Sequence, residues 1–346
     1  MCLVSHWAAA APALPARPQR PGWQQRPQRR SGCCRAQRGD AGDDDGPPAT
    51  ANRLSATVRR KQREVAALLQ ELGEEDLEER LTSAGRSPAQ PAHRLAQLIA
   101  DVVPTGRPVL VLELSRGPGV ASSAALGELA AAALVAGADA LAVKTDSEDT
   151  PEPLKDVLAA TQAAAAAFER QRPPPRANPF AGPEPAPAPV LQRDWFLHPI
   201  QVVSAKEAGA AGILGVIASV TSRGTPLMSS FAASIGLDCP VEIVNMQELQ
   251  AMERFRVPFF AMNLSVGLSV QLQGFGLQVA SGLLGEMPFG SISMVGASSI
   301  EDARKARQAG ADSILIKWEL VQQYAGDHSR LAQLLEELRY ATSGDD

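Results

Sequence analysis

The stretch PVLQRDWFLHPIQVVSAKEAGAAGIL, residues 189–214, decides the fold of this chain. It opens with a short apolar run, continues through a loop into a helical segment, and reaches Gly209 just before a second apolar run. A glycine at this position ends a helix in the left-handed conformation, and the apolar residues after it enter a buried strand. The stretch therefore predicts a strand, a helix and the start of a second parallel strand.

The same helix-to-strand junction recurs on either side of this stretch, in AGADAL at residues 136–141 and AGADSIL at residues 309–315. Beyond Gly106, short β-branched runs alternate with Ala-rich helical stretches. The predicted strands are Pro108–Leu114, Asp139–Lys144, Pro189–Asp194, Gly212–Ile217, Cys239–Val244, Val257–Asn263, Gly290–Val295 and Asp312–Lys317. Eight such strands over about 210 residues predict an α/β fold, a (β/α)8 TIM barrel. A doubly wound open sheet is the rival, but no strand is followed by GxGxxG.

The composition excludes several classes of protein. Apolar residues make up 45% and charged residues 21%, which allows a large buried core. No uninterrupted apolar run approaches the ~20 residues of a membrane-spanning helix, so no membrane span is expected. The four Cys include no CxxC pair and the four His are scattered, so the sequence indicates neither a disulfide scaffold nor a metal site. No cofactor is expected. The formal net charge of -5 argues against nucleic acid as a partner.

That charge is unevenly distributed. Residues 1–39 hold seven Arg, no Lys and no acidic residue, so they carry +7 and the remainder carries -12. An Arg-rich, acid-free leader without an apolar core of 7–15 residues is typical of an organelle transit peptide. We expect cleavage near Cys33–Ala36, before the acidic run Asp43–Asp45. The alternative is a basic tail that binds an acidic partner.

The rest of the chain divides into three predicted regions. Residues 46–105 form a helical N-terminal extension, because Val58, Val65, Leu68 and Leu72 recur at helical spacing. Residues 106–325 form the barrel, and residues 326–346 a C-terminal helix and tail. A Pro-rich insertion at residues 170–189 cannot continue a helix or a strand, and we expect a solvated loop on the N-terminal face of the barrel. A docking segment for a partner is the alternative.

Functional residues of such a barrel lie at the C-terminal ends of its strands. The predicted ends supply Glu113, Ser115, Lys144, Asp146, Arg193, Asp194, Glu242, Asn263, Met294 and Lys317. Carboxylates, an amide and cations that converge on one mouth suit an anionic substrate and acid–base chemistry. The alternative is that charged residues simply prefer strand ends near water. Glu113 and Glu242 together favour the functional interpretation over this alternative, because an inward-pointing unpaired carboxylate is costly.

Several of these segments resemble indole-3-glycerol-phosphate synthases. PVLVLELSRGPG (108–119) is similar to their first strand, AEIKxxSPSxG, and residues 189–214 to their third strand and helix, VLRKDFIIDxYQIxEARAxGADAIL. PVEIVNMQEL (240–249) parallels VEVHxxxEL, FFAMNLS (259–265) parallels IGINNR, and residues 301–321 resemble the last helix and strand. RRKQREV (59–65) resembles the helix that precedes the barrel. The resemblance runs, with gaps, from about Leu54 to Tyr324.

The resemblance implies decarboxylative ring closure of a carboxyphenylamino-deoxyribulose phosphate, a step of tryptophan synthesis. In the family a third-strand Lys is the general acid, and a first-strand Glu and Lys and a fifth-strand Glu transfer the other protons. A sixth-strand Asn, a seventh-strand Glu–Ser pair and backbone amides after strands seven and eight hold substrate and phosphate. Glu113, Glu242 and Asn263 match the first-, fifth- and sixth-strand residues of this set. A plastid location follows from the family, so we expect the chloroplast, with the mitochondrion as the alternative.

Other positions depart from the family. Ser115 stands at the first-strand Lys, Arg193 at the general-acid Lys, Met294 at the seventh-strand Glu and Lys317 at a Gly of the phosphate site, although Gly296 is kept. Arg cannot act as a general acid, because its pKa is above ~12. We therefore expect catalysis from Glu113, Arg193, Glu242 and Asn263 to be severely reduced or absent. Ser115, Gly296 and Lys317 are candidates for substrate or phosphate binding.

Two hypotheses follow. The first is a divergent but active indole-3-glycerol-phosphate synthase, a carboxy-lyase. The second, which the losses favour, is a non-catalytic or repurposed barrel, a pseudoenzyme that serves as a binding or assembly component. Its expected partners are a phosphorylated small-molecule ligand and a protein. The sequence leaves the oligomeric state open.

Overall fold

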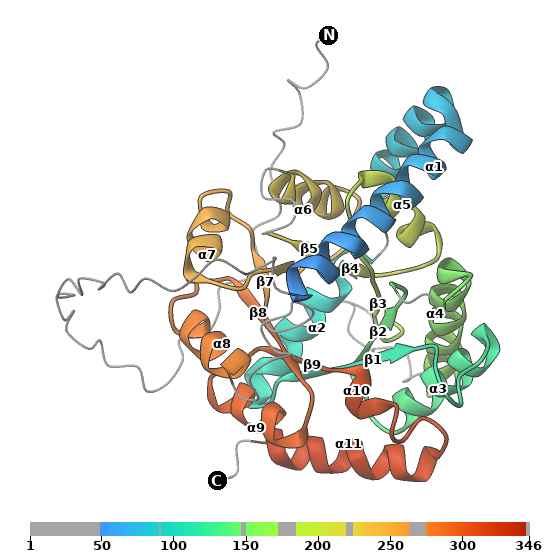
Figure 1. Ribbon diagram of the computed structural model, residues 1–346. Helices are drawn as coiled ribbons and strands as arrows, with labels where there is room; N and C mark the ends of the chain where they lie inside the picture. Colours follow the sequence, from blue (N-terminus) through green and yellow to red (C-terminus); the bar gives the residue numbers. More distant parts are fainter. Residues whose placement is uncertain are drawn as a thin grey trace, which may run out of the picture.

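The computed structural model describes residues 49–89, 91–146, 150–171, 185–218, 224–262 and 275–343. Within these residues parallel strands form a barrel surrounded by helices, and two helices precede the first strand (Figure 1). This arrangement confirms the predicted TIM barrel with its N-terminal helical extension. The predicted transit peptide, most of the Pro-rich insertion and Asn263 lie outside the described residues.

The eight predicted strands are present, and the fourth is divided in two. The strands are β1 Val109–Ser115, β2 Ala140–Lys144, β3 Val190–Arg193, β4 Gly212–Leu214, β5 Val216–Ile217, β6 Val241–Glu242, β7 Phe259–Met262, β8 Ile292–Ala297 and β9 Ser313–Ile316. They are parallel and follow the order β4-β3-β2-β1-β9-β8-β7-β6-β5. Because β4 and β5 are consecutive pieces of one chain segment, the two ends of this order meet and the sheet closes.

Gly215 separates the two pieces. Before it, β4 pairs with β3, and after it, β5 pairs with β6. The φ of Gly215 is +109°, and a Cβ atom added there would lie 1.6 Å from the backbone oxygen of Asp194. Glycine is required at this position because the backbone needs a positive φ and passes directly against the end of β3.

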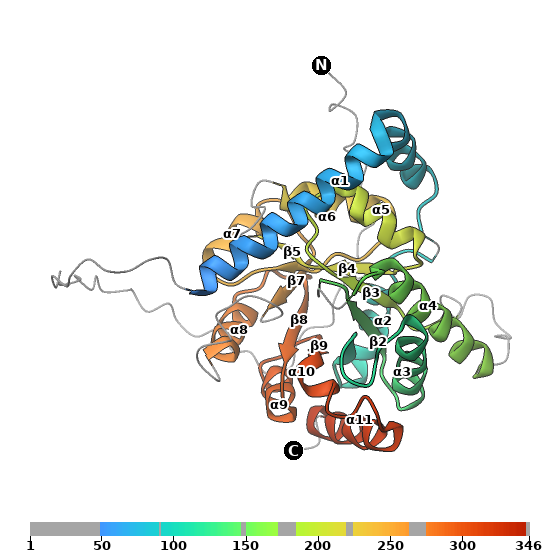
Figure 2. The ribbon, with the colours of Figure 1, turned by 45° about the vertical axis from the view of Figure 1, so that its right-hand side comes forward.

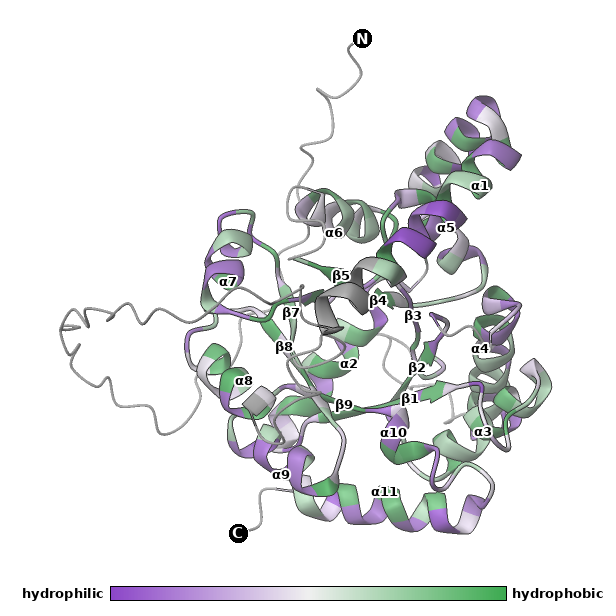
Figure 3. Ribbon diagram, viewed as in Figure 1, coloured by the Kyte–Doolittle hydropathy of each residue, from purple (hydrophilic) through white to green (hydrophobic). Residues whose placement is uncertain are grey.

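Helices cover the outside of the barrel. They are α3 Ser123–Val135, α4 Pro153–Arg170, α5 Pro199–Glu207, α6 Thr225–Ser234, α7 Met246–Glu253, α8 Phe275–Gly285, α9 Ile300–Gln308 and α11 His328–Thr342, with the short α10 Trp318–Val321 after β9. The side chains of Ser122, Asn245 and Ser299 accept backbone N–H groups at the first turns of α3, α7 and α9. Figure 3 shows hydrophobic strands inside a ring of helices with mixed character. None of the described helices is long and apolar enough to cross a membrane.

The strand alternation places one set of side chains inside the barrel. Val111, Leu191, Leu315 and Met294 belong to a buried cluster in the interior. Residues two positions further along a strand point the same way, toward the carboxyl ends of the strands. The interior above the apolar cluster is therefore filled by the side chains that follow these residues on each strand.

The two N-terminal helices close opposite ends of the barrel. Leu95 and Ile99 of α2 (Arg94–Val102, followed by the 3-10 turn η1 Val103–Thr105) belong to the interior cluster and plug the N-terminal end. Helix α1 (Ala49–Arg86), kinked at Gly73, crosses the carboxyl ends of the strands and then follows α5 (Figure 2). The extension thus covers the face on which function is expected.

Candidate active site

Four charged side chains form a polar layer at the carboxyl ends of the strands. Glu113 lies on β1, Arg193 on β3, Glu242 on β6 and Lys317 directly after β9. Each is buried, with exposed fractions between 2% and 6%. The layer results from alternation, since Glu113, Arg193 and Lys317 each follow an inward-facing apolar residue by two positions. The structure thus brings together four of the seven predicted site residues.

Glu113 is held by two partners from distant parts of the chain. Its Oε1 lies 2.6 Å from Nη1 of Arg193, and its Oε2 accepts a 2.8 Å hydrogen bond from the backbone N–H of Trp318. Burial acts to lower the pKa of the Arg193 guanidinium, but the nearby charges of Glu113 and Glu242 outweigh it and raise that pKa. Arg193 therefore keeps its positive charge and neutralises Glu113.

Trp318 closes the turn between β9 and α10. It is buried, and its indole ring lies against the loop after β1, because a Cβ atom added at Gly117 would be 3.5 Å from Trp318 Cζ2. The N–H groups at a strand-to-helix turn are suited to bind anions. Here the first of these N–H groups already binds the carboxylate of Glu113.

Helix α1 contributes a further cation to the mouth of the barrel. Nζ of Lys61 lies 2.8 Å from Oδ1 of Asp194, and both residues are buried. Burial acts to lower the pKa of Lys61, but Asp194 and Glu64 outweigh it and raise that pKa. Burial raises the pKa of Asp194 despite the opposing effect of Lys61. The ion pair joins α1 to the end of β3 and fixes the helix over the mouth.

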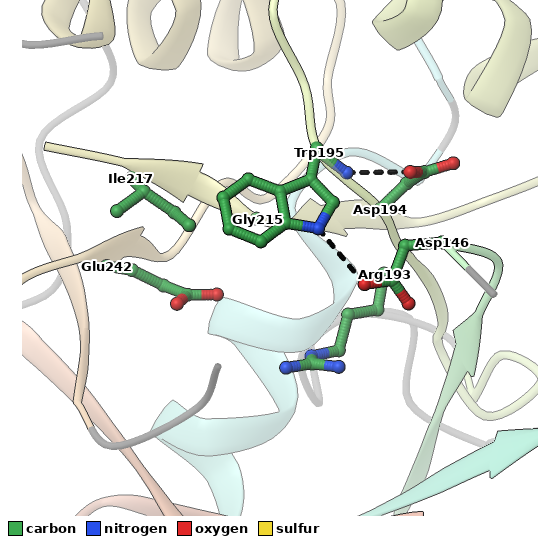
Figure 4. A pocket seen from close by; sticks show the side chains of 7 residues that line it. All are labelled: Asp146, Arg193, Asp194, Trp195, Gly215, Ile217 and Glu242. Carbon is green, nitrogen blue, oxygen red and sulfur yellow. Dashed lines mark hydrogen bonds between the residues drawn. The ribbon is translucent and has the colours of Figure 1, made fainter. Parts of the chain in front are cut away.

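A small cavity lies beneath α1. Its empty volume, open solvent included, is about 190 Å³, and its lining residues are Asp146, Arg193, Asp194, Trp195, Gly215, Ile217 and Glu242. Nε1 of Trp195 donates a 3.0 Å hydrogen bond to Oδ2 of Asp146. Figure 4 shows Glu242 and Arg193 reaching toward one another from opposite walls, with the Trp195 ring above them.

Lys317 differs from the other cations of the site. It is 6% exposed, and among the described residues no acceptor forms a hydrogen bond or ion pair with its Nζ. Burial lowers its pKa, and the positive charge of Arg193 acts in the same direction. Lys317 is therefore a buried amine whose neutral form is favoured relative to that of an ordinary lysine.

The remaining predicted residues are placed as follows. Ser115 is buried at the end of β1, and Gly296 lies in β8 opposite Leu315 of β9. Asn263 is outside the described residues, and its role stays a prediction. No group of three His, Cys, Asp or Glu side chains in the described part of the chain is placed to hold a metal ion.

Lys61 and Trp318 are site residues that the sequence does not predict. Lys61 lies in the segment RRKQREV, whose helical pattern indicates a surface helix and not a position over the mouth. Lys61 is 133 positions from Asp194, and Trp318 is 205 positions from Glu113. Contacts at such separation depend on the closure of the barrel, so no local signal could have found them.

The comparisons with known proteins identify the family. The family model described as indole-3-glycerol phosphate synthase matches residues 54–329. The chain belongs to this family. Its sequence is 26% identical to an indole-3-glycerol phosphate synthase of Opitutus terrae over 77% of this chain and 92% of that protein. An indole-3-glycerol phosphate synthase of Bordetella pertussis is 27% identical over 37% of this chain and 48% of its own length.

Solved structures show the same fold at lower identity. A tryptophan synthase structure from Mycobacterium tuberculosis has a TM-score of 0.54 and 17% identity, and the match covers 72% of this chain and 98% of that one. As a member of the indole-3-glycerol phosphate synthase family, this chain has the ancestry of a tryptophan-biosynthesis barrel.

Proposed function

We propose that this member of the indole-3-glycerol phosphate synthase family does not catalyse the ring closure of the family and is a repurposed binding or assembly component. One observation carries the proposal. Arg193, at the position of the general-acid Lys, forms a buried 2.6 Å ion pair with Glu113, at the position of the first-strand Glu. Two positions that the family uses for proton transfer are thereby engaged with each other.

The chemistry of these groups supports the proposal. A general acid must release its proton near neutral pH, and the raised pKa of Arg193 prevents this. Each general acid–base step is typically worth ~10²–10⁴-fold in rate. Ser115 and Met294 replace two further functional residues of the family, and Met294 is fully buried in the interior cluster. The combined loss of reaction rate is expected to exceed the loss from any single proton-transfer step.

The occupied anion site supports the same proposal. In the family, backbone amides after strands seven and eight hold the phosphate of the substrate. Here the N–H group of Trp318 binds Glu113, and the preceding position carries the buried side chain of Lys317 in place of Gly. Even with open solvent included, the space beneath α1 is about 190 Å³, which is less than the ~300–1,000 Å³ typical of ligand sites and allows a small ligand at most.

We expect no measurable turnover when the purified protein is given the carboxyphenylamino-deoxyribulose phosphate of the family at high enzyme concentration. Formation of indole glycerol phosphate, followed by its fluorescence, should lie at least ~10⁴-fold below that of the Opitutus terrae relative assayed in parallel. Turnover within ~100-fold of that enzyme would contradict the proposal.

The second candidate function is a divergent active synthase. It is favoured by the retention of Glu113 and Glu242 in the polar layer and by the presence there of a buried amine, Lys317. The assay of turnover distinguishes the two functions directly.

A variant with Ser115→Lys, Arg193→Lys and Met294→Glu tests whether the pocket itself has changed, because regained activity would mean that only the catalytic groups were lost. A stoichiometric protein partner captured from organelle extract would support the assembly role.

We also propose import into the chloroplast, which rests on the seven Arg and the absence of acidic residues in residues 1–39. A fluorescent protein fused behind residues 1–45 is expected to accumulate in chloroplasts of plant cells. Replacing the seven Arg by Gln should abolish import, whereas replacing Gln24 and Gln25 by Ala should not. Accumulation in mitochondria would correct the organelle, and cytosolic fluorescence would overturn the proposal.

A further inference from the structure

Helix α5 begins with a cap that depends on the protonation state of one side chain. Nδ1 of His198 accepts a 3.2 Å hydrogen bond from the backbone N–H of Ile200. Pro199 at the first helical position has no N–H group, so the bond from Ile200 satisfies the first N–H donor of the helix. A ring nitrogen accepts a hydrogen bond only when it carries no proton, whereas both nitrogens of a protonated imidazole are donors. The cap therefore exists only while His198 is neutral.

The same cap holds the β3–α5 loop, residues 194–198. The backbone N–H groups of Leu197 and His198 donate hydrogen bonds of 2.8 and 3.0 Å to Oε1 of Gln201. Nε2 of Gln201 in turn donates a 3.0 Å hydrogen bond to the backbone oxygen of Trp195. His198 and Gln201 form a capping box, in which each side chain binds the backbone at the other residue's end of the turn. Since Trp195 lines the space beneath α1, the start of α5 positions one wall of the mouth.

The surroundings of His198 oppose its protonation. Burial lowers the pKa of its half-buried ring. The ring also lies at the first turn of α5, where the positive end of the helix dipole disfavours a second positive charge. The native protein therefore binds a proton at His198 less readily than an unfolded chain does.

The charged side chains on the elements packed against α5 have other partners. Lys61 of α1 pairs with Asp194 after the end of β3, and Asp156 of α4 pairs with Arg116. Arg80 of α1 contacts the opposite, C-terminal end of α5, and neither β4 nor α6 contains a charged residue. Burial is the influence that shifts the pKa of His198, so none of these groups holds a proton on its ring.

A capping residue of another type would not respond to mild acid. In VLRKDFIIDxYQI, the family pattern that residues 189–202 resemble, Asp stands at the place of His198. An Asp carboxylate, with an ordinary pKa of ~3.9, stays an acceptor over the range in which a histidine gains its proton. Helix α11 of this chain has such a cap, since Asp327 accepts hydrogen bonds from the N–H groups of Ser329 and Arg330. The histidine at α5 thus makes the start of this helix sensitive to pH.

We propose that His198 is a pH-sensitive latch: its neutral ring caps α5 and holds the β3–α5 loop, and protonation in mildly acidic solution releases the loop. Protonation turns the N–H of Ile200 and a new N–H of the ring toward one another, so the ring rotates away. The first turn of α5 then loses its cap, and Trp195 loses the support of Gln201. Because the pKa in the folded protein lies below the ordinary 6.5, the stabilisation is complete above pH 6.5 and is lost as the pH falls through the lowered pKa.

The test is amide hydrogen exchange of the full-length protein at about pH 7.5 and about pH 5, corrected for the intrinsic exchange rates. Protection of residues 195–203 is expected to fall by about 3- to 10-fold at the lower pH, within the range that loss of an N-cap produces. The first turn of α11, capped by Asp327, should keep its protection. Titration of the His198 ring by NMR should give a midpoint below 6.5. Unchanged protection of residues 195–203, or a midpoint at or above 6.5, would overturn the proposal.

Three variants assign the effect to the ring of His198. His198→Asp keeps an acceptor without a titration in this range, so protection should be high and constant. His198→Ala removes the acceptor, so protection should be low at both pH values. His328→Gln changes an exposed histidine at the start of α11 and should keep the pH dependence of the unaltered protein.

Asp194 is the other titrating group of the loop, and burial raises its pKa. A pH dependence that persists in His198→Asp would assign the release to the pair of Asp194 with Lys61 and would eliminate the latch. The exchange and titration measurements require no substrate. Their failure therefore counts against His198 alone, and the turnover assay tests the proposed function alone.

Discussion

Gly215→Ala is expected to lower the free energy of unfolding by more than about 4 kcal/mol, which is exceptional for a single substitution. A Cβ atom at this position would lie 1.6 Å from the backbone oxygen of Asp194, far inside van der Waals contact, and the φ of +109° is unfavourable for alanine. Relief of this clash would require the backbone to move at the junction between β4, which pairs with β3, and β5, which pairs with β6. Urea denaturation followed by circular dichroism measures the change.

Gly290→Ala is the matched control. Gly290 also has a positive φ, +82°, but no atom lies within 4 Å of the position of an added Cβ. Its substitution should lower the free energy of unfolding by about 1–2 kcal/mol, which is the cost of holding alanine at a positive φ. The difference between the two variants therefore isolates the contact with Asp194. An equal loss of unfolding free energy in the two variants would show that the close approach of Gly215 to the backbone oxygen of Asp194 does not constrain the fold.

The sequence predicts the barrel well because its signals are local. Each strand is a short apolar run, and several of the preceding helices end at a glycine, such as Gly137, Gly209 and Gly310, which have positive φ values in the structure. The sequence predicts one strand over Gly212–Ile217 and gives no sign of the break at Gly215. Nothing within that run shows that the backbone oxygen of Asp194, just after the end of β3, excludes a side chain there.

The candidate site was predictable only in part. Strand alternation places Glu113, Arg193, Glu242 and Lys317 in one layer, as the sequence indicates. The pairing within that layer was not predictable, since it depends on which charges the closed barrel brings into contact. The cation from Lys61 and the N–H group of Trp318 reach the site only through the packing of α1 and α10.

Glu113→Gln should destabilise the protein by about 3–5 kcal/mol, the cost of leaving one partner of a buried ion pair without its counter-charge. The glutamine side chain is close in shape to glutamate but uncharged, so Arg193, with its side chain 7% exposed, would lose the carboxylate 2.6 Å away. Arg193→Met should cost a similar amount, because among the described residues the carboxylate of Glu113 would then keep the hydrogen bond from the N–H group of Trp318 but no ion pair. Equilibrium unfolding in guanidinium chloride measures both variants.

The double variant Glu113→Gln/Arg193→Met decides whether the two residues act as a pair. Arg193→Met removes the positive charge near Glu242 in the single and the double variant alike, so that cost cancels in the comparison. With both charges of the Glu113–Arg193 pair removed, the double variant should be more stable than the sum of the single costs predicts by about 2–3 kcal/mol. Glu301→Gln, which breaks an exposed ion pair with Arg304, is the control and should change stability little. Additive single costs would mean that Arg193 and Glu113 are stabilised separately. The proton-transfer positions would then be available to a substrate, which would remove the observation on which the proposed loss of catalysis rests.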